Sequence, residues 1–175
     1  MTRSVMLLRA VNVSGRNLVP MGRLREVLAP QLGEVSTYIA SGNIVCDEPD
    51  DPAAACARVR ALISAEFGVD TPVILRTHEA LVRAENSHPF ADASDKLLHA
   101  MFLEGPASPG AVAALEQRLV PGERIALTGE ELWIAYSERG VHSTKLTKAA
   151  LDKALGVAGT ARNLRTVRTL VELTA

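Results

Sequence analysis

The sequence predicts an α+β fold in which two β-α-β-β-α-β units follow one another along 175 residues. Three observations predict this class. Short apolar runs alternate with stretches whose apolar residues recur at helical spacing. A turn signal separates the second and third apolar runs of each half, and the same order of elements occurs twice. A hydrophobic content of 47% with 22% charged residues is sufficient for a substantial core.

Residues 1–76 are expected to form the first unit. Strands are marked by short apolar runs, helices by periodic apolar positions, and ends by Gly or Pro. The expected elements are a strand at Val5–Arg9, a helix from Pro20 through Leu28, strands at Val35–Ala40 and Ile44–Asp47 joined by the turn Ser41-Gly42-Asn43, a helix through Phe67 that Gly68 ends, and a strand at Pro72–Arg76.

Residues 97–175 are expected to form the second unit, and residues 77–96 to connect the two. The expected elements are a strand at Leu98–Leu103, a helix with Val112, Leu115 and Leu119 on one face, a hairpin of Arg124–Thr128 and Leu132–Tyr136, a helix carrying Leu146, Ala150 and Ala154 that Gly156 ends, a strand at Gly159–Arg162, and an extra C-terminal helix capped by Asn163. This order is the split β-α-β arrangement of ferredoxin-like folds, so two tandem ferredoxin-like units are predicted.

The topology predicts where the polar loops meet. In such a unit the loop after the first strand and the hairpin between strands two and three lie at one edge of the sheet. A Gly-containing loop that leads into a helix is suited to bind anions, and arginine pairs well with phosphate or carboxylate. The candidate ligand-binding residues of the first unit are Arg9, Asn12, Gly15, Asn17, Ser41, Gly42 and Asn43, with Ser14 and Arg16 in the same loop.

A second basic cluster is predicted in the other unit. The loop after its third strand, residues 137–144, and the end of its last strand are expected at one edge. The candidate ligand-binding residues there are Lys145, Arg162, Asn163 and Arg165, with His142 and Ser143 nearby. In both clusters the alternative is structural, because Asn and Ser also build tight turns and cap helices.

Charge is distributed unevenly around a net charge of −1. Residues 1–40 carry +3, residues 139–175 carry +5, and the middle carries −9. Such asymmetry favours an anionic ligand at the two ends of the chain, although the oppositely charged parts could equally neutralise one another.

Three functions follow as hypotheses. The first is binding of a small anionic ligand, phosphorylated or not, by these loops, with or without catalysis. The second is nucleic-acid binding by the basic C-terminal helix, where Arg165 and Arg168 share a face; it is weakened by strands that lack the stacking aromatics of RNA-recognition modules. The third is a structural or interaction protein without catalysis. Oligomeric state cannot be deduced from the sequence.

Other classes are disfavoured. No apolar run approaches the roughly 18–20 residues that span a bilayer, and no signal peptide is recognisable, so a cytoplasmic location without membrane attachment is expected. Cys46 and Cys56 are predicted to be buried small hydrophobes. The histidines show no metal-ligand spacing, and no P-loop, GxGxxG or GxSxG motif is present, so neither a metal nor a cofactor is expected.

Several segments together carry a family resemblance: LLRAVNVSGRN, TYIASGNIVCDE, EFGVDTPVILRT, NSHPFAD, DKLLHAMFL and GVAGTARNLRTVRTL. They resemble the domain-of-unknown-function 1697 (DUF1697) family of bacterial proteins over nearly the whole chain. The resemblance implies a pair of ferredoxin-like halves and no established activity. The sequence departs from the family pattern at four positions, which are Ala10, Ser14, Ala40 and Leu164. Because Leu164 stands where the family usually has Trp, a stacking role is in doubt there.

Overall fold

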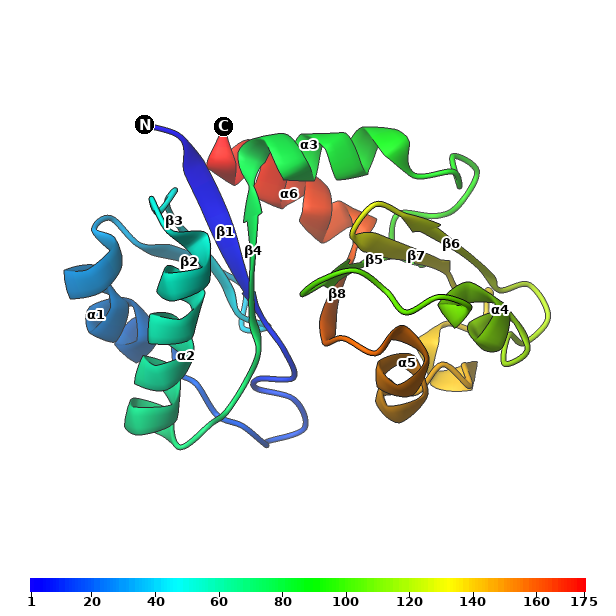
Figure 1. Cartoon of the computed structure of the whole chain (residues 1–175), viewed down its shortest axis with the longest axis horizontal. Helices are drawn as coiled ribbons and strands as arrows, with labels where there is room; N and C mark the ends of the chain where they lie inside the picture. The colour runs from blue at the N-terminus through cyan, green and yellow to red at the C-terminus, as the bar shows by residue number, and fades with distance from the viewer. The chain divides into compact units, whose positions relative to one another are not determined.

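The computed structural model of the protein describes residues 1–175 and contains two four-stranded antiparallel sheets with six helices (Figure 1). The first half consists of β1 (Arg3–Leu8), α1 (Met21–Leu32), β2 (Ser36–Tyr38), β3 (Asn43–Asp47), α2 (Pro52–Phe67), β4 (Val73–Thr77) and α3 (His78–Ser87). The second half consists of β5 (Leu98–Leu103), α4 (Ala111–Glu116), β6 (Arg124–Thr128), β7 (Glu131–Ala135), a single 3-10 turn (Val141–Ser143), α5 (Lys148–Leu155), β8 (Gly159–Asn163) and α6 (Leu164–Thr174).

The chain divides into two compact units. Unit 1 comprises residues 1–81 and 170–175, and unit 2 comprises residues 82–169. The division expected from the sequence was different, with units at residues 1–76 and 97–175 and a connecting segment at residues 77–96. The strand order is β2-β3-β1-β4 in the first sheet and β6-β7-β5-β8 in the second, with every neighbouring pair antiparallel.

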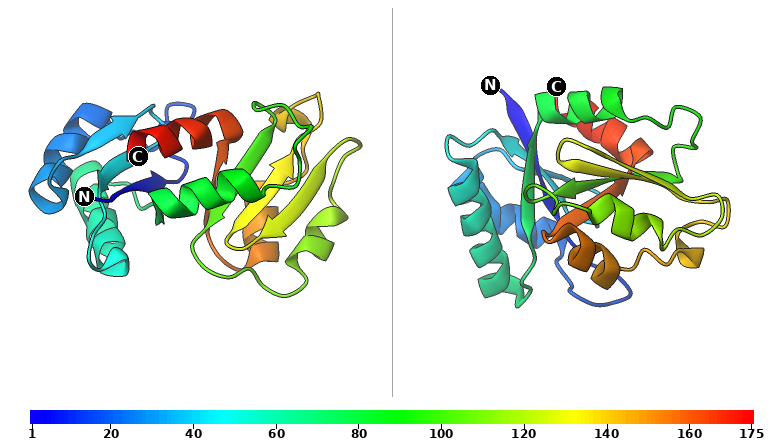
Figure 2. Two further views of the ribbon diagram at one scale, coloured as in Figure 1. Left: turned by 90° about the horizontal axis from the view of Figure 1, so that it is seen from above. Right: turned by 45° about the vertical axis from the view of Figure 1, so that its right-hand side comes forward.

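Unit 1 buries one face of its sheet under α1 and α2 (Figure 2). Met6 and Leu8 of β1 belong to that core, together with Leu28 of α1 and Val59 of α2. Side chains alternate along a strand, so Val5 and Leu7 point to the other face, and both are fully buried. The near-continuous apolar run in β1 therefore reflects burial on both faces.

Helix α2 is limited by the signals that the sequence carries. Asp51 is its N-cap and accepts a hydrogen bond from Ala54 N at 3.0 Å, and Pro52 occupies the first turn, where its missing N–H costs nothing. Gly68 ends the helix in the left-handed conformation, as predicted. Helix α1 runs through Leu32 although it contains Pro30 near its C-terminal end.

Unit 2 repeats the pattern. Met101 and Leu103 of β5 pack with Leu115 of α4 and Leu151 of α5, so these helices cover one face of the second sheet (Figure 1). Thr147 caps α5 by accepting a hydrogen bond from Ala150 N at 3.2 Å. Gly156 ends α5 in the left-handed conformation, again as predicted.

The two halves correspond further than the sequence suggested. Each ends in a helix that follows the fourth strand directly, so α3 lies in the segment that was expected only to connect the units. The residue before each helix caps it: Thr77 Oγ1 accepts from Ala80 N at 3.1 Å, and Asn163 Oδ1 accepts from Thr166 N at 2.9 Å. One residue earlier stands an arginine, Arg76 or Arg162, each 7% exposed. None of the helices is long and apolar enough to cross a membrane.

Candidate functional site

The loop after β1 meets the β2–β3 hairpin at one edge of the first sheet, as the topology predicted. Leu8 N donates a hydrogen bond to Gly42 O at 2.8 Å, which closes this edge. The backbone of Arg9 is fixed from the other side, because Arg9 N donates to Thr71 Oγ1 at 3.0 Å and the same hydroxyl donates to Arg9 O at 2.8 Å. Thr71 is 1% exposed. The loop therefore leaves the sheet from a rigid base.

Asn12 anchors the loop through its side-chain amide. Its Nδ2 donates to Ala40 O in the hairpin at 2.8 Å and to Val19 O at 3.0 Å, and its Oδ1 accepts from Val19 N at 2.8 Å. The amide thus ties the start of the loop both to its end and to the hairpin. Asn17 completes the structure by donating from Nδ2 to Ala10 O at 3.0 Å. Both asparagines shape the loop.

Backbone strain is concentrated at this edge. All of the non-glycine residues with positive φ lie in the loop or the hairpin, at Ala10, Asn12, Ser14, Asn17 and Ile39, with φ between 49° and 54°. Asparagine tolerates this conformation better than alanine, serine or isoleucine, for which it costs free energy. Such strain persists where surrounding contacts fix the backbone, and it often accompanies functional sites.

The strained loop encloses a shallow pocket of about 470 Å³, lined by Ala10, Val13, Ser14, Arg16 and Asn17. Arg16 is exposed and forms no ion pair or hydrogen bond through its side chain. The same loop exposes two apolar side chains: Val13 is 55% exposed and Leu18 61%. This edge therefore presents a free guanidinium beside exposed apolar surface on a rigid backbone.

The hairpin differs from the prediction in the placement of its turn. Residues 39–42 form the turn, and Asn43 is the first residue of β3 and fully buried. Its Nδ2 donates to Tyr38 O at 2.8 Å and to Ser41 Oγ at 3.1 Å, so Asn43 and Ser41 stabilise the hairpin from inside. Gly42 has φ of 89°, and an added Cβ would lie 2.7 Å from Leu8 Cβ. Only glycine fits at this position.

The second predicted cluster does not come together. Lys145 precedes Leu146, which packs in the core on the helix side of the second sheet. The carbonyl oxygen of Lys145 accepts a hydrogen bond from Arg118 Nε at 3.1 Å. Ala161 pairs with Met101 of that same core, so its neighbour Arg162 points to the opposite face. The expected contact between Lys145 and Arg162 was wrong because the topology fixes which edge a loop reaches but not which face it then follows.

Arg162 and Asn163 have structural contacts. Arg162 Nη1 donates to Thr160 Oγ1 at 2.7 Å and to Ala161 O at 2.9 Å within its own strand. Burial lowers the pKa of the Arg162 guanidinium to about 10, because desolvation disfavours the charged form. Asn163 caps α6, as predicted.

The basic face of α6 is partly neutralised within unit 2. Arg165 is exposed, but Arg168 donates from Nε to Glu85 at 3.2 Å and from Nη1 to Asp95. Burial, and next the positive charge of Arg168, lower the pKa of the nearby His88. The stripe that the nucleic-acid hypothesis requires is therefore interrupted by two carboxylates.

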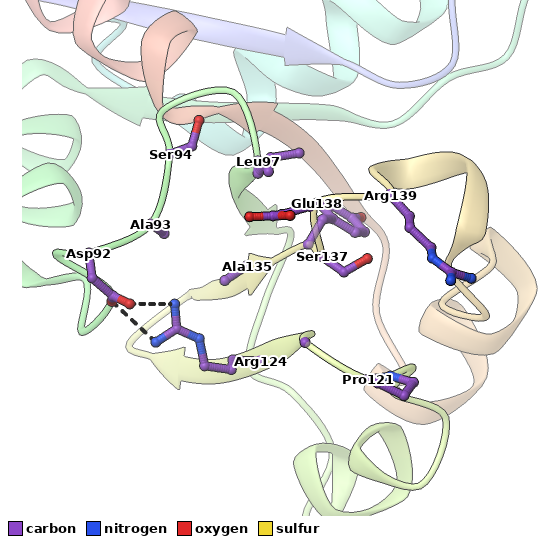
Figure 3. Close-up of a pocket in the computed structure, with 12 residues that line it drawn as sticks. Asp92, Ala93, Ser94, Leu97, Pro121, Arg124, Ala135, Ser137, Glu138 and Arg139 are labelled. Carbon is purple, nitrogen blue, oxygen red and sulfur yellow. Dashed lines mark hydrogen bonds and ion pairs between the residues drawn. The ribbon is translucent and has the colours of Figure 1, made fainter.

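Unit 2 contains a larger pocket that sequence reasoning missed. It measures about 630 Å³ and lies where β5 and β6 begin and β7 ends (Figure 3). Arg124, Ser137, Glu138 and Arg139 are among its lining residues. The turn signal Glu138-Arg139-Gly140 directly after a strand was the available clue, since turns at a sheet edge commonly carry function.

Cys46 and Cys56 form no disulfide. Cys46 is buried and Cys56 half-buried, both as free thiols, and burial raises the pKa of Cys46. No group of three or more His, Cys, Asp or Glu side chains is arranged to hold a metal ion.

Fold and site together define an α+β protein with two four-stranded antiparallel sheets and a strained, arginine-bearing loop at one sheet edge. The profile of a family described as "Protein of unknown function (DUF1697)" matches residues 1–133, so the chain belongs to the DUF1697 family. Among solved structures, the conserved bacterial protein SP0830 from Streptococcus pneumoniae is similar, with 23% identity over 99% of both chains and a TM-score of 0.77. At this identity the similarity concerns the fold. A comparison with curated proteins found no match.

Proposed function

We propose that the protein binds a small anionic ligand, carrying a phosphate or a carboxylate, in the pocket of the 10–17 loop. The observation that carries the proposal is the unpaired Arg16 guanidinium beside a pocket whose backbone is already fixed. A guanidinium presents a planar set of N–H donors that matches two oxygens of such a group. Because the loop is rigid, little conformational entropy would be lost on binding.

The roles of the predicted residues differ within this proposal. Arg16 contacts the anion, and Ser14 and Asn17 line the same pocket. Gly15, at φ of 72° with open space around its Cα, leaves the backbone accessible to a ligand. Asn12, Asn43 and Gly42 shape the edge. Arg9, whose backbone is fixed beside Thr71, lies at the base of the loop.

Binding is testable by titrating ¹⁵N-labelled protein with inorganic phosphate, sugar phosphates and nucleotides while recording amide chemical shifts. We expect perturbation of amides in residues 10–17 and a loss of affinity of roughly tenfold in Arg16→Ala, the cost of one charge-assisted hydrogen-bonding group. The matched control is Arg58→Ala, which removes an exposed, unpaired arginine from α2 in the same unit. Absence of any shift in the loop, or equal weakening by both variants, would contradict the proposal.

The alternative functions predict other outcomes. Nucleic-acid binding would give a strongly salt-dependent response to oligonucleotides centred on Arg165, but the pairing of Arg168 with two carboxylates speaks against it. A structural or interaction protein would respond to no small anion. The internal hydrogen bonds of Asn12 are compatible with a purely structural role of the loop. The unpaired Arg16 has no role in holding the loop together, so a structural role leaves it unexplained.

We also infer that each half is a ferredoxin-like unit, as the family resemblance implies. The strand orders β2-β3-β1-β4 and β6-β7-β5-β8 support this inference, since the first and second strands of each half flank an antiparallel third strand. Helices that cover one face of each sheet add to that support.

A further inference from the structure

The unit 2 pocket is built by three segments that meet at one edge of the second sheet. Asp92, Ser94 and Leu97 come from the loop before β5, Pro121 and Gly122 from the loop before β6, and Ser137, Glu138 and Arg139 from the turn after β7. Its volume of about 630 Å³ lies in the range of pockets that hold small molecules.

One side of the pocket carries an arginine that is paired within the protein. Arg124 pairs with Asp92 through two parallel hydrogen bonds of 3.2 Å each, and its guanidinium carbon lies 4.8 Å from the centre of the Phe90 ring. The pairing lowers the pKa of Asp92, so that this carboxylate stays ionised. The positive charge of Arg124 is thus already compensated by Asp92.

The turn after β7 carries two charges that nothing compensates. Glu138 and Arg139 are exposed, and neither forms an ion pair with the protein. Figure 3 shows the Glu138 carboxyl group extending toward the side of Leu97 and Ser94, whereas Arg139 extends toward the opposite end. Free charges of opposite sign therefore extend in different directions from one turn that lines the pocket.

Two residues with hydroxyl groups, Tyr136 and Ser137, also line the pocket. Ser137 Oγ is buried without a partner within the protein. Tyr136 adds a phenol that remains protonated, because burial and the charge of Glu123 raise its pKa to about 12.

We propose that this pocket binds a small zwitterion of the amino-acid class, with its ammonium group toward Glu138 and its carboxylate toward Arg139. A purely anionic ligand would meet the uncompensated Glu138, and a purely cationic one would meet Arg139, so a molecule with both charges fits best. All lining residues belong to unit 2, so this site shares no residue with the pocket of the proposed function.

The test is a titration of ¹⁵N-labelled protein with the standard amino acids, followed for any binder by its deaminated acid and its decarboxylated amine. We expect shifts at residues 122, 137 and 139, and none at residues 10–17. Glu138→Gln should weaken binding of the amino acid roughly tenfold and leave the deaminated acid unaffected, while Arg139→Gln should weaken the acid. The matched control is Glu116→Gln, an exposed carboxylate on α4 without a partner.

Two outcomes would overturn the inference. One is that no amino acid perturbs the pocket amides. The other is that Glu138→Gln weakens the amino acid and its deaminated analogue equally, since the carboxylate would then not recognise the ammonium group. Because both substitutions affect exposed side chains, correct folding is expected and is checked by the unchanged amide spectrum of the remaining residues.

Discussion

Replacement of Asn12 tests whether the loop at the edge of the first sheet is held by one side chain. Asn12→Ala removes three hydrogen bonds, to Ala40 O, Val19 O and Val19 N, each contributing about 1 kcal/mol. It also places alanine at φ of 54°, where alanine lowers the free energy of unfolding by about 1 kcal/mol relative to a residue that tolerates positive φ. The bond to Ala40 is exposed and counts for less, so the expected decrease in the free energy of unfolding is about 3 kcal/mol.

Asn12→Gly separates the two contributions. Glycine adopts positive φ without strain but lacks the amide, so its expected decrease is about 2 kcal/mol, smaller than that of alanine. Urea denaturation followed by far-ultraviolet circular dichroism measures both values. The control is Asn86→Ala, at an exposed residue of α3 whose side chain forms no hydrogen bond in the fold, and a change within about 0.5 kcal/mol is expected.

Hydrogen exchange provides an independent measurement of the same anchor. Val19 N donates to Asn12 Oδ1, so this amide should lose protection in both variants, whereas amides of α2 should change only with global stability. The reasoning is refuted if Asn12→Ala costs less than about 1 kcal/mol and Val19 keeps its protection, because the loop would then owe its shape to other contacts.

Two further predictions concern stability. Gly42→Ala should decrease the free energy of unfolding by about 2–3 kcal/mol, because the new Cβ would lie 2.7 Å from Leu8 Cβ. Its control is Gly15→Ala, also at positive φ but in open space, which should decrease the free energy of unfolding by about 1 kcal/mol. Equal decreases for the two variants in denaturation curves would exclude the clash with Leu8. Burial lowers the pKa of His88 and His99, so stability should be complete above pH 6.5 and fall as the pH decreases below it.

The sign of the pH effect follows from proton uptake. With lowered pKa values in the folded state, the unfolded chain binds protons first as the pH falls below 6.5, and this favours unfolding. Denaturation midpoints measured between about pH 5 and 8 avoid the carboxylates, which titrate lower. The double variant His88→Gln with His99→Gln should flatten this dependence, while the exposed His142→Gln should not. If the denaturation midpoint of the double variant still depended on pH as strongly as that of the unmodified protein, the pH effect would come from groups other than His88 and His99.

Local signals predicted many helix ends correctly. Gly68 and Gly156 end α2 and α5 in the left-handed conformation, and Asn163 caps α6. These features depend on a few consecutive residues and on the backbone preferences of Gly and Asn, so they are readable without knowledge of the fold. Helix α3 was missed because it is short: only Leu81 and Ala84 are buried along its ten residues, and a single pair three residues apart does not establish a helical period.

The sites were less predictable because they depend on contacts between distant residues. The sequence indicated that the loop after β1 meets the hairpin, and the bond between Asn12 and Ala40 confirms this meeting. It could not indicate that Asn43 is buried in β3, since a shift of the turn changes the direction of a side chain. It also could not separate Lys145 from Arg162, because the face to which each segment turns is decided by packing.

The sequence alone determined the order of the elements other than α3, the two antiparallel hairpins and the edge at which the Asn-rich loop would stand, because periodicity and turn residues act locally and antiparallel connections leave few topologies. Tertiary structure alone decided which polar groups remain free. Hydrogen bonds across the edge occupy Asn12 and Asn43, carboxylates occupy Arg168, and burial encloses Arg162. Arg16, Glu138 and Arg139 stay unpaired, and a charge is available to a ligand only when the fold brings no partner to it.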